Sequence, residues 1–158
     1  MEDVTGMLAQ IAREELELRF ASFGEDTAWA LGQALAWRAQ ERRAPVVLNI
    51  RSSDRTYFHL ALPGSTPDND LWARRKSNTT LHLHRASLAV GAMMRGKGQD
   101  PDSFGLGRGL DPLSYSAHGG SFPIRLISGT VLGAITVSGL PQIEDHALIV
   151  ETLRGFLA

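Results

Sequence analysis

The stretch "HGGSFPIRLISGTVLGAITVSGLPQIEDH", residues 118–146, contains two hydrophobic runs followed by the start of a helix. The runs 122–128 and 131–138 are rich in branched residues and flank a short turn around Gly129, a pattern that predicts a β-hairpin. Pro141 then opens the amphipathic run 141–158, where acidic residues lie at the positive end of a helix dipole. The stretch therefore predicts two antiparallel strands followed directly by a helix.

The second strand of this hairpin is apolar on both sides. Val131, Ile135 and Val137 point to one face, and the residues that alternate with them on the opposite face are hardly more polar. A strand of this kind requires cover on both faces of its sheet. We therefore expect helices above and below the sheet.

The remaining elements follow from changes in hydrophobic period. We expect helices at 3–13, 24–43 and 71–94 (the last broken near Asn78), a strand at 15–20 ("ELELRF"), and a second hairpin from strands 46–50 and 56–62. Two hairpins and one further strand predict an α+β fold, in which a five-stranded, mainly antiparallel sheet has helices on both faces in a three-layer sandwich.

Composition narrows the class of protein. A chain of 158 residues predicts one domain, 1–158, and its formal net charge of −1 disfavours binding to nucleic acid or to anionic lipid. The absence of cysteine excludes disulfides, thiol catalysis and zinc–thiolate sites. No apolar run approaches the length of about 20 residues that a membrane span requires. We therefore expect a cytoplasmic protein that binds neither membranes nor nucleic acid.

Residues 80–116 suggest assembly. The run from Thr80 to Met94 is apolar on two sides of a helix, and the glycine-rich segment 96–116 shows no period of its own. We expect both to be ordered in a symmetric homo-oligomer, at least a dimer. His82 and His84 lie two apart on this helix, on different faces, so no metal site is assigned to them; His84 is expected to be buried.

The sequence resembles a known family. The matching segments are "AHGGSFPI" (117–124), "GTVLGAITVSGLPQIEDH" (129–146), "DTAWALG" (26–32) and "WARRKSNT" (72–79). They are similar to the haem-degrading domain family, GlcG/HbpS-like, and especially to its small cytosolic branch. The resemblance implies a profilin-like fold, a homo-oligomer, and haem or a related anionic cofactor as ligand.

The first candidate site is "HGGSFPI". Gly119 and Gly120 provide backbone freedom and exposed N–H groups, and His118 would be a haem-iron ligand or a donor to a carboxylate. Alternatively, the two glycines only form the turn into the strand, and His118 bonds to nearby backbone.

The second candidate lies at the start of the last helix. Ser138 and Gly139 precede a helix N-terminus, which binds anions through its free N–H groups. His146 lies in the second turn and could instead pair with Glu144 or Asp145, which would make this segment a structural cap.

Trp72 and Lys76 lie four apart and share a helix face. They would stack on a planar dianionic ligand such as haem and contact its propionate, or the lysine stem would simply pack over the indole. We assign Trp72, Lys76, His118, Gly119, Gly120, Ser138, Gly139 and His146 to a cofactor site, and no catalytic residue. The sequence predicts a ligand-binding module and leaves open a scaffolding oligomer or a slow haem-degrading or small-metabolite enzyme.

Overall fold

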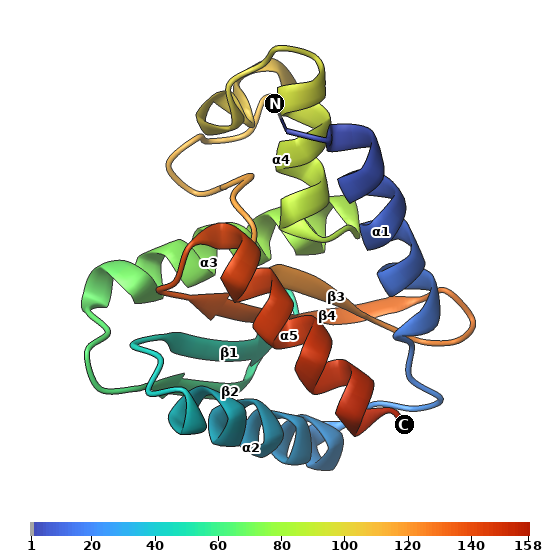
Figure 1. The fold of residues 1–158 in the computed structure, drawn as a ribbon, viewed down its shortest axis with the longest axis vertical. Helices are drawn as coiled ribbons and strands as arrows, with labels where there is room; N and C mark the ends of the chain where they lie inside the picture. Colours follow the sequence, from blue (N-terminus) through green and yellow to red (C-terminus); the bar gives the residue numbers. More distant parts are fainter. Residues whose placement is uncertain (1) are drawn as a thin grey trace.

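The computed structural model describes residues 2–158. In chain order its elements are α1 (Val4–Glu17), α2 (Glu25–Glu41), β1 (Val47–Arg51), β2 (Thr56–Ala61), α3 (Pro67–Leu83), α4 (Ser87–Gly96), the 3-10 turns η1 (Pro101–Ser103) and η2 (Leu106–Arg108), β3 (Ser121–Arg125), β4 (Val131–Ser138) and α5 (Gln142–Phe156) (Figure 1). Within residues 2–158, no helix is both long enough and apolar enough to cross a bilayer.

The sheet is antiparallel and has the strand order β2-β1-β4-β3. Both predicted hairpins are confirmed, since β1 pairs with β2 and β3 pairs with β4. The hairpins join through β1 and β4, where Ile50 faces Ile135. The α+β class is thus confirmed, but the sheet has four strands rather than the five that were predicted.

The missing strand is the run 15–20. Helix α1 continues to Glu17, and Phe20 makes only an isolated bridge to Leu126. Within α1 and its C-cap, the buried positions Ile11, Glu14 and Leu18 recur at helical spacing, whereas Leu16 is 66% exposed. The six-residue alternation was too short to distinguish the two periods, and the good helix propensity of Glu and Leu prevailed.

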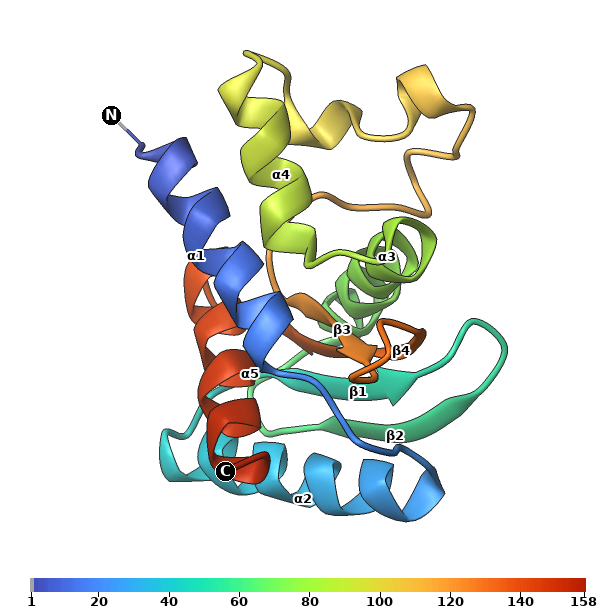
Figure 2. The same ribbon diagram turned by 90° about the vertical axis from the view of Figure 1, so that its right-hand side faces the viewer.

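Helices cover both faces of the sheet (Figures 1 and 2). Helices α2 and α5 pack on one face, where Leu48, Ile50 and Val137 form part of the main hydrophobic core. Helix α3 packs on the other face, where the alternate positions of β1 and β4 include Asn49, Thr136 and Ser138, all buried. The layer beneath α3 is therefore polar, and both cavities described below lie in it.

The predicted helix 71–94 is two helices. The chain breaks at His84, which adopts left-handed backbone angles (φ 57°, ψ 38°) and caps α3 through its N–H. Asn78 instead lies inside α3, where its amide donates to the Ser114 carbonyl oxygen. His84 is exposed, contrary to the expectation that it is buried.

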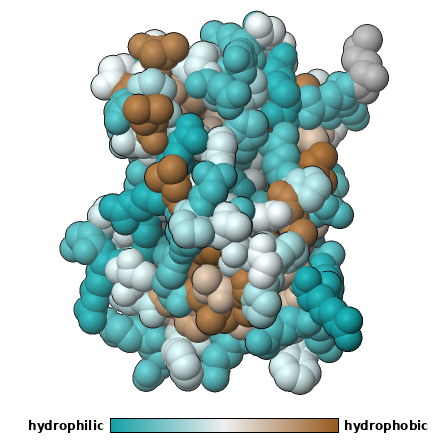
Figure 3. Space-filling view, turned by 90° about the vertical axis from the view of Figure 1, so that its left-hand side faces the viewer, coloured by the Kyte–Doolittle hydropathy of each residue, from teal (hydrophilic) through white to brown (hydrophobic). Residues whose placement is uncertain are grey.

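The glycine-rich segment packs against α4 of the same chain. Val90 is buried in a small cluster with Phe104 and Ala117, and Leu110 and Tyr115 pack around them. The apolar faces from which an oligomer was predicted are therefore covered within one chain. On the outside of the segment, Leu106 and Leu113 remain exposed, and Figure 3 shows apolar side chains in separate groups on one face of the molecule.

Candidate functional site

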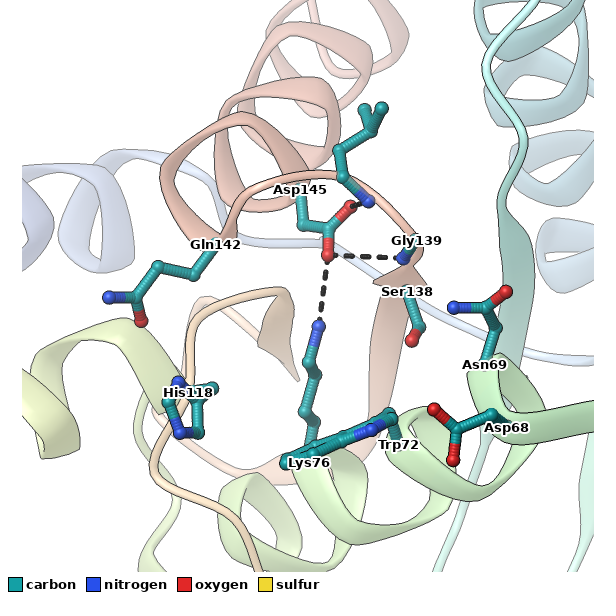
Figure 4. A pocket seen from close by; sticks show the side chains of 10 residues that line it. Asp68, Asn69, Trp72, Lys76, His118, Ser138, Gly139, Gln142 and Asp145 are labelled. Carbon is teal, nitrogen blue, oxygen red and sulfur yellow. Dashed lines mark hydrogen bonds and ion pairs between the residues drawn. The ribbon is translucent and has the colours of Figure 1, made fainter. Parts of the chain in front are cut away.

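A cleft of about 290 Å³ opens between α3 and the junction of β4 with α5 (Figure 4). We call it the α3–α5 cleft. It is lined by Asp68, Asn69, Trp72, Lys76, His118, Ser138, Gly139, Leu140, Gln142 and Asp145. One wall thus comes from a single face of α3, and the other comes from the turn that precedes α5.

A buried ion pair forms the floor of the cleft. Lys76 Nζ lies 2.9 Å from Asp145 Oδ2, and the two side chains are 6% and 0% exposed. Lys76 also donates to the Val137 carbonyl oxygen, and Asp145 accepts from the N–H groups of Leu140 and Gly139. Burial raises the pKa of Asp145 above its usual value, although Lys76 and these N–H groups favour the carboxylate. The pair ties α3 to the start of α5.

Two glycines allow the backbone to close around this pair. Gly120 has a φ of +127°, and a Cβ there would lie 2.5 Å from the Val137 carbonyl oxygen and 2.9 Å from Lys76 Nζ. Gly139 has a φ of +145°, and its Cβ would lie 2.4 Å from the Pro45 carbonyl oxygen. Neither position has the space or the backbone angles for a side chain.

His118 lies at the edge of the cleft and is held by two contacts. Its Nε2 is 2.7 Å from Asp102 Oδ1 in the glycine-rich segment, and its ring meets Trp72 edge-on with 5.5 Å between centroids. Its Nδ1 has no hydrogen-bond partner among residues 2–158. The guanidinium of Arg75 lies over the Trp72 ring at 4.3 Å. The histidine thus has one nitrogen bonded to a carboxylate and the other available.

The structure brings together most of the residues assigned from the sequence. Trp72, Lys76, His118, Ser138 and Gly139 line the cleft. Gly119 and Gly120 lie directly behind it as buried backbone, and Gly119 N–H donates to Gln142 Oε1.

His146 lies elsewhere. Its Nε2 is 2.7 Å from Glu14 Oε1, so its partner is on α1 rather than being Glu144 or Asp145. Both side chains are 7% exposed, and they lie in the groove between α1 and α5. His146 follows Asp145 by one position, which on a helix points its side chain about 100° away from the cleft.

Asn69 and Gln142 line the cleft and were missed by sequence reasoning. The side-chain oxygen of Asn69 accepts from Thr66 N–H, and that of Gln142 accepts from Gly119 N–H. Their NH₂ groups have no hydrogen-bond partner in the part of the chain that the structure describes. Asn69 and Trp72 lie three apart on α3, so helical spacing could have linked them. No local signal links Gln142 to α3.

These contacts determine what the cleft can bind. The charge of Lys76 is paired with Asp145 of the same chain, whereas the sequence suggested a ligand propionate as its partner. The two NH₂ groups are free donors suited to a carboxylate oxygen. Trp72 and His118 add flat apolar surface and a free imidazole nitrogen. The cleft therefore offers an aromatic surface, two amide donors and an imidazole nitrogen, beside the carboxylate of Asp68.

Comparison with known proteins agrees with the fold. A family model described as "Haem degrading protein HbpS-like" matches residues 23–154. A UPF0303 protein of Streptomyces coelicolor is 47% identical over 150 residues, which cover 95% of this chain and 93% of that relative. The solved structure of Ybr137w protein has a TM-score of 0.84 at 27% identity, covering 97% of this chain and 91% of its own.

A structure of a PduOC–haem complex has a TM-score of 0.66 at 21% identity, covering 85% of this chain and 93% of its own, a likeness that shows the fold alone. The family model spans most of this chain, and the Streptomyces relative matches it over nearly its full length. The chain belongs to the HbpS-like haem-degrading family.

Proposed function

We propose that the chain is a small ligand-binding module that holds haem, or a related planar anionic cofactor, at the α3–α5 cleft. The observation that carries the proposal is the free Nδ1 of His118 beside the Trp72 ring, with Nε2 fixed on Asp102. A histidine that binds a metal commonly donates its other N–H to a carboxylate, which sets the tautomer and the ring orientation. The haem complex of PduOC, which shares the fold, supports this ligand class.

The residues of the cleft fit such a group in part. His118 would provide the axial nitrogen, Trp72 a stacking surface, and the NH₂ groups of Asn69 and Gln142 hydrogen bonds to propionates. Bound haem would supply redox chemistry at its iron. The cleft volume of about 290 Å³ is at the lower end of the range for ligand pockets, so it would enclose only one edge of the macrocycle. The rest of the ring would lie at the surface.

A haemin titration tests the proposal. We expect the wild-type chain to give a saturable Soret shift at one equivalent, and His118→Ala to weaken binding about tenfold or more while changing stability little, since the side chain is 37% exposed. His82→Ala is the matched control, because that histidine is also exposed but lies outside the cleft. The proposal fails if wild type shows no saturable shift, or if both variants bind like wild type.

We also propose that copies of the chain associate through α2. Trp29 and Trp37 lie eight apart on this helix, about 80° from each other around its axis, and are 59% and 66% exposed. Exposed indoles are enriched at protein interfaces, and a symmetric pair of helices would bury both. Light scattering should give a mass of at least two 17.2 kDa chains at micromolar concentration. Trp37→Lys should lower that mass, and a wild-type monomer would contradict the proposal.

A further inference from the structure

A second polar cavity lies beneath α3, between that helix and strands β1 and β2. Its volume is about 200 Å³, and we call it the arginine cavity. It is lined by Asn49, Arg51, Thr56, His59, Asp70, Ala73, Arg74 and Ser77, none of which lines the α3–α5 cleft.

Arg51 is a buried cation without an acidic partner. The residue is 3% exposed, and its guanidinium donates to the Ser77 hydroxyl at 2.8 Å, the Ser52 carbonyl oxygen at 3.1 Å and the Asn78 amide oxygen. All three acceptors are neutral, and no carboxylate lies within 4.0 Å of Arg51 among residues 2–158. Burial, with the nearby charge of Arg74, lowers the pKa of Arg51 to about 10. A buried charge with only neutral partners is costly, and a bound anion would relieve this cost.

The other lining residues strengthen the case. Arg74 is exposed and makes no ion pair or side-chain hydrogen bond within the described chain, so its guanidinium is free to contact an anion at the mouth of the cavity. The carboxylate in the lining, Asp70, is bonded to His59 Nε2 at 2.6 Å. Asn49 presents Nδ2 to His59 Nδ1 at 3.0 Å, and its Oδ1 is enclosed by the protein, without a hydrogen-bond partner among residues 2–158.

We propose that the arginine cavity binds a small tetrahedral oxyanion, of which inorganic phosphate is a common example. The guanidiniums of Arg51 and Arg74 face the charged oxygens, since arginine pairs well with phosphate. The volume admits an ion of this size and no large ester substituent. The site is independent of haem binding at the α3–α5 cleft.

Isothermal titration with inorganic phosphate at neutral pH tests the site. We expect saturable binding at one equivalent, weakened about tenfold or more in Arg74→Gln, because a charge-assisted hydrogen bond is lost. Arg13→Gln is the matched control: Arg13 is exposed on α1 and makes no side-chain hydrogen bond or ion pair in the described chain, so the variant removes the same charge far from the cavity. Equal weakening in both variants, or none in Arg74→Gln, would overturn the proposal.

Two further measurements make the test sharper. Sulfate has the shape and the charge of phosphate, so it should displace phosphate from the cavity; a failure of sulfate to compete would refute the assignment to a tetrahedral oxyanion. Arg51→Lys keeps the buried charge but loses the forked geometry, and we expect it to weaken phosphate binding as well. If Arg51→Lys does not fold, Arg74→Gln still decides the outcome. An absence of phosphate binding to wild type would overturn the proposal whatever the haemin titration shows.

Discussion

Replacing Lys76 by methionine removes the cation that contacts the Asp145 carboxylate at 2.9 Å, while keeping a long side chain in the buried space. Asp145 would then be fully buried with only the N–H groups of Leu140 and Gly139 as partners. Breaking one side of a buried ion pair costs about 3–5 kcal/mol. Total stabilities of domains are commonly about 5–15 kcal/mol, so the loss is a large part of the whole.

Urea unfolding followed by circular dichroism measures this cost, and thermal melting gives a second estimate. For a chain of this size about 2–4 °C is lost per kcal/mol, so we expect the Tm to fall by about 6–20 °C. Lys97→Met is the matched control, because Lys97 is exposed and caps α4 only through its backbone. The control should change the free energy of unfolding by about 0.5 kcal/mol or less.

The double variant Lys76→Met with Asp145→Asn identifies the cause. If the buried charge is the source of the cost, the neutral amide should recover much of the stability, since its oxygen still accepts from Leu140 N–H. The pKa of Asp145 is already raised by burial, and losing Lys76 raises it further above its value in the unfolded chain. The deficit of Lys76→Met should therefore be largest at neutral pH and shrink as the pH falls through the folded pKa. A single variant within about 1 kcal/mol of wild type, or a double variant less stable than the single one, would refute this reasoning.

Three other substitutions test individual contacts in the folded chain. Gly120→Val should destabilise the chain and weaken ligand binding, because its φ of +127° and the Val137 carbonyl oxygen exclude a branched side chain; an unchanged Tm would contradict this, and Gly107→Val, with open space around it, is the control. Burial alone would raise the pKa of Glu14, but the hydrogen bond and charge of His146 hold that pKa below its usual value of 4.5. The stability that this pairing contributes is therefore present above pH 4.5, and it is lost as the pH falls through the lower pKa of the folded chain. Unfolding free energies from pH 3 to 7 should show a shallower acid limb in Glu14→Gln, and an unchanged slope would contradict the assignment. Val90→Asp should unfold the chain rather than dissociate an oligomer, because Val90 packs on Phe104 and Ala117 of the same chain; a folded monomer by circular dichroism and light scattering would contradict this.

Elements whose pattern is long or bounded by clear punctuation were predictable from the sequence. The hairpin around Gly129 and the helix after Pro141 are where local pattern places them, as α5 runs from Gln142 to Phe156. Short or ambiguous patterns failed. The run 15–20 fits both the helical and the strand period. The break at His84 depends on how α4 packs, and the local sequence contains no signal that predicts it.

The sequence by itself determined the α+β class, both hairpins, the family resemblance and the pairing of Trp72 with Lys76 on one helix face, because these depend on local spacing. Only the tertiary structure decided that Lys76 meets Asp145 across 69 positions, that Glu14 rather than Asp145 holds His146, and that Arg51 is buried with no acidic partner among residues 2–158. Such partners are selected by which buried charges the fold brings within hydrogen-bonding distance. That choice depends on the packing of α3 against the sheet and of α1 beside α4 and α5, which the spacing of residues along the chain does not encode.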